Sequence, residues 1–181
     1  PRHRSPGRNI AVIGDPGIGK SVVAAAAVPN AAVGQGVSLL ATDPWFALNR
    51  AVGALPRSGG PEAVASRVIA ALDGRPLLID DLQWVDPATL EVLQFLSSVV
   101  ATARPEAQAL AEQLGFECVV LAPLDAAAAA TLARSVNPEA DVDAVVAFAM
   151  GNPLAIVTAA RDGVGALGDV VAKRLVSLDE V

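Results

Sequence analysis

The segment from Gly14 to Ser21, GDPGIGKS, has residue types and a spacing that can hold a phosphate group. It satisfies the pattern G-x-x-x-x-G-K-[ST] and directly follows an apolar run, IAVI, at residues 10–13. Backbone N–H groups of a glycine-rich loop can point at phosphate oxygens, and the N-terminus of the next helix adds the positive end of its dipole. The pattern therefore predicts a phosphate-binding loop between a strand and a helix.

Within this loop, two residues have distinct expected roles toward a nucleotide. Lys20 is expected to reach the β and γ phosphates as a point charge, and the Ser21 hydroxyl is expected to bind Mg²⁺. A chance match would occur in roughly one in a thousand sequences of this composition, and lysine is scarce here, with only Lys20 and Lys173 in the chain. The predicted nucleotide contacts are Gly14, Asp15, Pro16, Gly17, Ile18, Gly19, Lys20, Ser21 and Val22.

A second group of residues suited to chemistry lies at the end of the apolar run at residues 77–80, LLID. Asp80 is predicted to hold Mg²⁺ at the γ-phosphate side, and Asp81 to orient or deprotonate the attacking water. The alternative is that Asp81 or Asp86 caps a helix beginning near Pro87. For Asp86, which directly precedes the proline, the capping interpretation is favoured.

Alternating strands and helices are predicted to position these groups in the first two thirds of the chain. Strands are expected at 9–13, 37–41, 77–80, 99–103 and 117–121, with helices at 20–28, 46–54, 62–72, 88–97 and 106–114. Short apolar strands separated by helices are typical of a parallel sheet covered on both faces, in an α/β sandwich of three layers. We therefore expect an α/β nucleotide-binding domain over residues 1–122.

After Pro123 only helical patterns remain, at 125–135, 139–149, 153–161 and 165–176. Asp125 can cap the first of these helices, whose alanine run reflects high helix propensity. The expected second domain is a small helical subdomain, or lid, over residues 123–181.

Composition narrows the possible partners. The formal net charge of −6 and the pI near 4.7 argue against direct contact with nucleic acid.

Cys118 is the only cysteine, so no intrachain disulfide can form, and it is expected to be a small core residue. No apolar run reaches the roughly 18 residues of a membrane span. We expect a cytoplasmic chain without membrane contact, and a first residue other than Met suggests a fragment of a longer or processed protein.

Taken together, the motifs resemble a known family. GDPGIGKS at 14–21, LLIDDLQWVDPATLEVLQFL at 77–96, VVATARPE at 99–106, LAPLD at 121–125 and GNPLAI at 151–156 look like the ATPase domain of the STAND class of P-loop, AAA-like proteins. The closest resemblance is to the domain of large ATP-binding LuxR-type and MalT-like bacterial transcriptional regulators. The first two segments correspond to the Walker A and Walker B motifs of that class.

The resemblance implies a fold, a cofactor and further site residues. It implies a sheet order of 5-1-4-3-2, bound ATP or ADP with Mg²⁺, and a sensor arginine at Arg104 that responds to the γ-phosphate. Gly151-Asn-Pro153 matches a G-x-P signature whose proline lies near the adenine. In such families ADP holds a closed, inactive state, and exchange for ATP permits assembly. The resemblance thus implies a protein partner or self-association in the ATP state.

The sequence is compatible with three functions. The preferred one is a signalling switch that hydrolyses ATP slowly, with Asp81, Lys20 and Arg104 as its catalytic residues. The second is a conventional phosphoryl-transfer enzyme, such as a small-molecule kinase, and the third is an interaction module that binds nucleotide without turnover. DNA-binding and repeat domains of the regulators are not found among these residues, so any DNA contact is expected to belong to other sequence.

Overall fold

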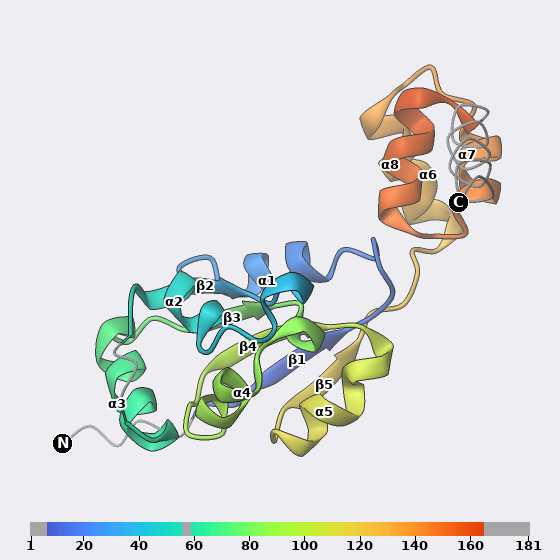
Figure 1. Ribbon diagram of the computed structural model, residues 1–181. Helices are drawn as coiled ribbons and strands as arrows, with labels where there is room; N and C mark the ends of the chain where they lie inside the picture. Colours follow the sequence, from blue (N-terminus) through green and yellow to red (C-terminus); the bar gives the residue numbers. More distant parts are fainter. Residues whose placement is uncertain (1–6, 56–58, 165–181) are drawn as a thin grey trace. The chain divides into compact units, whose positions relative to one another are not determined.

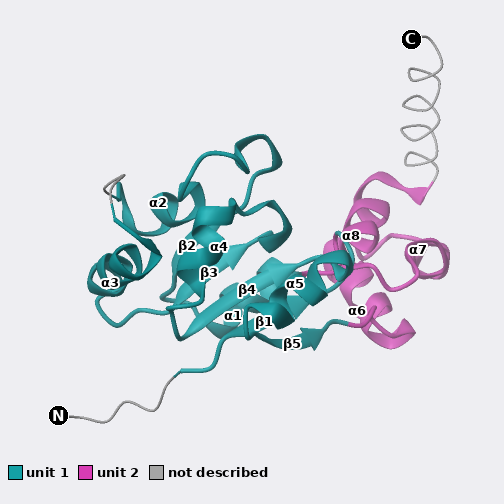
Figure 2. Cartoon of the chain, turned by 60° about the horizontal axis from the view of Figure 1, so that its bottom comes forward, with its two compact units in different colours: residues 1–16, 20–121 teal, residues 17–19, 122–181 magenta. Residues whose placement is uncertain are grey.

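A computed structural model describes residues 7–55 and 59–164 (Figure 1). The chain divides into two compact units, which are coloured separately in Figure 2. The first consists of Pro1–Pro16 and Lys20–Leu121, and the second of Gly17–Gly19 and Ala122–Val181. The first unit contains the sheet, and the secondary structure described in the second unit is helical.

A five-stranded parallel sheet forms the centre of the first unit. Its strands are β1 (Ile10–Ile13), β2 (Ala32–Gln35), β3 (Leu77–Asp80), β4 (Val99–Ala103) and β5 (Glu117–Val120). Their spatial order is β5-β1-β4-β3-β2, which confirms the predicted α/β class and the predicted order. Because all the strands run in parallel, the carboxyl ends of β1, β3 and β4 lie at one edge, the usual ligand-binding edge of such sheets.

Helices cover the two faces of this sheet unequally. The larger core lies between one face and residues of α2 (Phe46–Val52), α3 (Pro61–Leu72), α4 (Pro87–Leu93) and α5 (Gln108–Gln113). On the other face Val12, Leu78 and Val100 pack with Ala24 of α1 (Lys20–Ala27). These helices occupy the predicted places, although α3 and α4 begin one residue earlier than predicted and the helices other than α3 end earlier. No helix in the described ranges is both long and apolar enough to cross a bilayer.

The second strand was predicted in the wrong place. The predicted segment, residues 37–41, contains a short 3₁₀ turn, Ser38–Leu40, in which Leu39 is 90% exposed, and the strand is Ala32–Gln35 instead. Gly34 and Gly36 weaken the sequence pattern that would predict a strand here. Both are required because neighbouring backbone lies too close to leave room for a side chain. A Cβ at Gly34 would lie 2.3 Å from the carbonyl oxygen of Ala47, and one at Gly36 would lie 2.4 Å from that of Asp81.

The helical unit has its own apolar core. It contains α6 (Ala126–Val136), α7 (Val142–Ala149) and α8 (Pro153–Asp162), whose inward residues form a separate buried cluster. Asp125 accepts a hydrogen bond from the N–H of Ala128, which confirms its predicted capping role. The predicted helix at 165–176 lies outside the described residues.

Candidate nucleotide-binding site

The predicted phosphate loop begins where β1 ends. The N–H of Gly14 donates to the carbonyl oxygen of Ala103 at 3.2 Å, which ties the start of the loop to the end of β4. Gly17 and Gly19 have φ angles of 79° and 96°, values that side chains with a Cβ rarely adopt. A Cβ at Gly19 would meet no atom within 4 Å. The loop thus has the glycine conformations and, at Gly19, the open space that a phosphate cradle needs.

Lys20 and Ser21 open α1 at the end of this loop. Lys20 is 8% exposed, and its Nζ donates to the carbonyl oxygens of Gly14 and Asp15, each at 2.9 Å. The ammonium is therefore held inside the loop. Ser21 is exposed, as are Asp15, Pro16 and Val22, whereas Ile18 is buried.

Asp80, at the end of β3, lies beside Ser21, and the Mg²⁺ that both were predicted to hold stays a prediction. The Ser21 Oγ contacts both carboxylate oxygens of Asp80, at 2.8 and 3.0 Å, and the hydroxyl of Thr102 also donates to that carboxylate. A hydroxyl and a carboxylate are the hard oxygen donors that Mg²⁺ prefers, and Mg²⁺ commonly binds through one or two protein oxygens together with phosphates.

Asp81 begins a short 3₁₀ turn, Leu82–Trp84, in a left-handed backbone conformation with φ 58°. Its N–H donates to Thr102 Oγ1 at 3.0 Å, and its carbonyl oxygen accepts from the N–H of Trp84 at 2.9 Å. Its carboxylate accepts from Nε2 of Gln83 at 2.9 Å. Asp tolerates the left-handed region better than most residues, so this residue type suits the turn.

Asp86, not Asp81, caps α4. The carboxylate of Asp86 accepts from the N–H of Thr89 at 2.9 Å and from its hydroxyl at 2.7 Å. It also accepts from the N–H of Trp45 at 2.9 Å. Asp86 is buried and fully engaged in these structural bonds, which confirms its capping interpretation and leaves Asp81 facing a different set of groups.

Arg104 follows β4 and lies beside the turn at 82–84. Its backbone N–H donates to Oε1 of Gln83 at 3.2 Å, and its guanidinium carbon lies 5.8 Å from the centroid of the Trp84 ring. A guanidinium over an indole at this range is stabilised by about 0.5–1 kcal/mol at an exposed site. Glu106 is 4.0 Å from the same guanidinium, at the outer limit of an ion pair.

Two further residues of this arrangement, Thr102 and Gln83, were not predicted from the sequence. Thr102 is fully buried and links Asp80 to the backbone of Asp81. Thr102 could have been suspected, because it is the only polar residue in the apolar strand VVATA. Gln83 left no such signal, because its two bonds depend on the conformation of the turn.

Cys118 was expected to be a small core residue, but it is only partly buried. It packs against the larger core from β5. Burial, and secondarily the negative charge of Glu112, raises the pKa of its thiol above the ordinary value. The nucleophilic thiolate is therefore disfavoured at neutral pH.

Pro153, the predicted adenine contact, is the first residue of α8 in the helical unit. Asn152 precedes it as the helix cap and accepts from the N–H groups of Leu154 and Ala155 at 3.0 and 3.2 Å. Gly151 has φ 78°, and a Cβ there would lie 2.4 Å from the carbonyl oxygen of Leu124. The Gly-x-Pro segment thus has a structural reason for its glycine and its proline, and the nucleotide contact of Pro153 stays a prediction.

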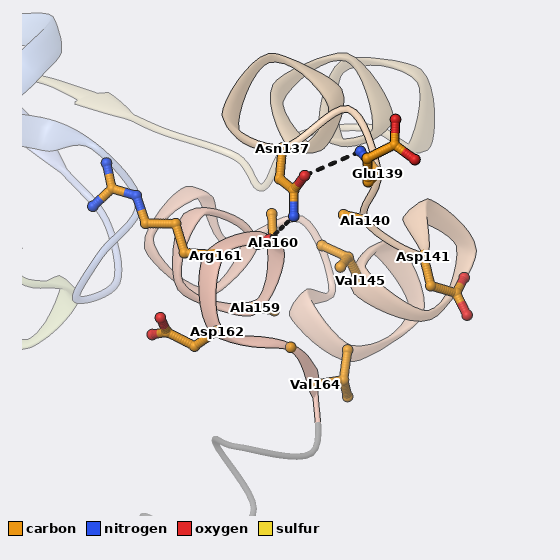
Figure 3. Close-up of a pocket in the computed structure, with 11 residues that line it drawn as sticks. Asn137, Glu139, Ala140, Asp141, Val145, Ala159, Ala160, Arg161, Asp162 and Val164 are labelled. Carbon is orange, nitrogen blue, oxygen red and sulfur yellow. Dashed lines mark hydrogen bonds between the residues drawn. The ribbon is translucent and has the colours of Figure 1, made fainter.

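The helical unit also has a pocket of 310 Å³ lined by residues of its loops and of α7 and α8 (Figure 3). The side chain of Asn137 makes two hydrogen bonds at this pocket. It donates to the carbonyl oxygen of Ala160 and accepts from the N–H of Glu139. Figure 3 shows the charged ends of Arg161 and Asp162 pointing away from Asn137. These charged groups do not converge on a ligand position here.

Comparison with known proteins supports the fold. By sequence, the chain matches no known family and no curated protein. Among solved structures, it resembles a Signal Transduction ATPase with Numerous Domains (STAND) protein with a tetratricopeptide repeat sensor from Pyrococcus horikoshii, with a TM-score of 0.51 and 18% identity. The match covers 82% of this chain and 26% of that protein. The chain thus has a STAND-like P-loop fold.

Proposed function

We propose that this chain is the nucleotide-binding switch domain of a signalling ATPase, which binds ATP with Mg²⁺ and hydrolyses it slowly to ADP and phosphate. One observation carries the proposal. A connected set of hydrogen bonds joins Ser21, Asp80, Asp81 and Arg104 at the carboxyl edge of the sheet, beside a glycine-rich loop. These are the groups that phosphoryl transfer to water requires.

Each group has a task that follows from its position. Bound MgATP supplies the phosphoryl group, with the metal offsetting its charge. Lys20 holds the phosphate oxygens, while the Ser21 hydroxyl and the Asp80 carboxylate hold the metal. Asp81 orients the attacking water and accepts its proton at a carboxylate oxygen. Arg104 presents a cation to the γ-phosphate.

The wider setting is also proposed from the sequence resemblance. We infer a cytoplasmic bacterial regulator of the LuxR-type or MalT-like kind, in which the ADP or ATP state controls the arrangement of the helical unit and permits assembly with a partner or a second copy. Pro153 then contacts the adenine. The acidic balance of the chain supports partners other than nucleic acid for this part.

The test compares ATP and ADP binding and single-turnover hydrolysis in the wild type, Lys20→Ala and Asp81→Asn. Lys20→Ala is expected to lose nucleotide binding, whereas Asp81→Asn is expected to keep binding and lose turnover. Asp73→Asn is a matched control, because Asp73 is exposed and has the same left-handed conformation, with φ 47°. It should behave as the wild type.

Other results would point elsewhere. A wild type that binds neither nucleotide, or equal turnover in all variants, rejects the proposal. Normal ATP affinity without cleavage, unchanged by Asp81→Asn, indicates an interaction module. Rapid ADP release that depends on an acceptor molecule indicates a conventional phosphoryl-transfer enzyme.

A further inference from the structure

The side chain of Gln83 lies between the two groups to which hydrolysis is assigned. Its Nε2 donates to Oδ1 of Asp81 at 2.9 Å, and its Oε1 accepts the backbone N–H of Arg104 at 3.2 Å. A carboxamide is suited to this place because it donates and accepts at once. Glutamate has the same shape but cannot donate to a carboxylate when ionised, and it would add a like charge beside Asp81.

The neighbouring Trp84 faces the other end of Arg104. Its indole is 38% exposed, and the guanidinium carbon of Arg104 lies over the ring at 5.8 Å from the centroid. The arginine side chain is long and flexible, so without this surface its cation would sample many positions. Gln83 thus holds the backbone at 104 and Trp84 holds the charged end.

The turn that presents both side chains is itself closely held. The carbonyl oxygen of Asp81 accepts a hydrogen bond from the N–H of Trp84, and the N–H of Val85 donates to the carbonyl oxygen of Leu82 at 3.2 Å. The turn packs so closely on Gly36 that a Cβ there would lie 2.4 Å from the carbonyl oxygen of Asp81 and 2.8 Å from the carbonyl carbon of Trp84. The positions of residues 83 and 84 are therefore set by backbone contacts.

We propose that Gln83 and Trp84 are positioning residues for the hydrolysis of ATP, with the carboxamide fixing the Asp81 carboxylate relative to the backbone of Arg104 and the indole confining the arginine guanidinium. This inference rests on the proposed function. It adds that Asp81 and Arg104 act as one assembly built on the turn after β3. Neither positioning residue is assigned a contact with the reacting atoms.

The first test is single-turnover hydrolysis in Gln83→Met and Gln83→Glu. Both variants should bind ATP within about twofold of the wild type, and both should hydrolyse it at least about tenfold more slowly, because each loses a hydrogen bond to a charged group. Gln108→Met is the matched control, since Gln108 also donates to a carboxylate, that of Glu112, but on the exposed surface of α5. It should leave turnover unchanged.

The second test concerns the aromatic surface. Trp84→Leu should slow hydrolysis at unchanged ATP affinity, and Trp84→Phe should restore most of the rate because it keeps a ring face for the guanidinium. Phe95→Leu removes another exposed aromatic side chain from the same unit and serves as the control. Equal rates in Trp84→Leu and Trp84→Phe would overturn the role of the indole.

A third measurement needs no nucleotide and separates this inference from the proposed function. Amide hydrogen exchange at Arg104 should be faster in Gln83→Met than in the wild type or in Gln108→Met, because the acceptor of that N–H is removed. If the wild type fails to hydrolyse ATP, the proposed function is rejected and the positioning role for hydrolysis is rejected with it, although faster exchange would still confirm the link to Arg104. If hydrolysis is present, unchanged turnover or unchanged exchange in Gln83→Met overturns the inference.

Discussion

The hydroxyl of Thr102 connects two carboxylate residues from the interior of a strand. It donates to Asp80 and accepts the N–H of Asp81, so a single buried atom orients the expected metal ligand and the expected base. Its side chain is fully buried, and its two bonds leave little freedom for another residue type. At position 102 the loss of the hydroxyl is therefore expected to lower the stability of the protein more than the loss of side-chain volume does.

Thr102→Val tests this expectation with nearly the same shape. The variant leaves the N–H of Asp81 without its acceptor, so we expect the free energy of unfolding to fall by about 1–3 kcal/mol. Urea denaturation measures the loss. Thr102→Ser keeps the hydroxyl and removes only a methyl group, so it should lose less; a larger loss in the serine variant would contradict the assignment.

Only part of the candidate site could be predicted from the sequence. The glycine loop and the acidic strand end were predicted from local patterns, and the resemblance implied the strand order that the sheet has. The link through Gln83 depends on the left-handed conformation of Asp81. That conformation is not visible in residue types alone.

Among the elements, α8 begins at a segment whose glycine has two separate structural requirements. Gly151 has φ 78°, and the space where its Cβ would lie is occupied by the backbone of Leu124. The N–H of Leu124 also donates to the carbonyl oxygen of Gly151 at 2.9 Å. The start of α8 and the segment before α6 are therefore joined at backbone level.

Gly151→Ala and Gly163→Ala separate backbone strain from steric conflict. Gly163 has φ 82° but no atom within 4 Å of an added Cβ, so its substitution measures strain alone, about 1–3 kcal/mol. Gly151→Ala adds the conflict with Leu124 and should destabilise the helical unit further. Circular dichroism during denaturation measures both variants, and equal losses would contradict the close approach.

The misplaced second strand is the clearest failure at this scale. The segment at 37–41 has more apolar side chains than Ala32–Gln35, and periodicity therefore favoured it. The actual strand carries Gly34, and Gly36 follows it, because neighbouring backbone leaves no room for side chains. Such contacts come from residues distant in sequence, so a local pattern does not report them.

At the scale of the whole molecule, the two units have separate apolar cores. The sheet unit encloses residues such as Leu93, and the helical unit encloses residues such as Ile156, each with no exposed area. Trp45 and Trp84 both belong to the first unit. Tryptophan fluorescence therefore reports one unit, while circular dichroism reports helices of both.

Leu93→Ala and Ile156→Ala test whether the cores are independent. Each substitution should remove about 2–5 kcal/mol from the unit that contains it. Leu93→Ala should lower the denaturation midpoint seen by fluorescence, whereas Ile156→Ala should lower only a component seen by circular dichroism. A single transition that moves equally with both variants would show that the units unfold as one.

Gly36 lies after an edge strand of the sheet, yet its bare backbone is in contact range of the turn that begins at Asp81. Selection that maintains the geometry around Asp81 therefore also constrains a position 45 residues earlier in the chain. In a library of variants, tolerance at residue 36 should follow that of the turn more closely than that of its own strand. A glycine without a chemical role is therefore expected to be under the same sequence constraint as the site itself.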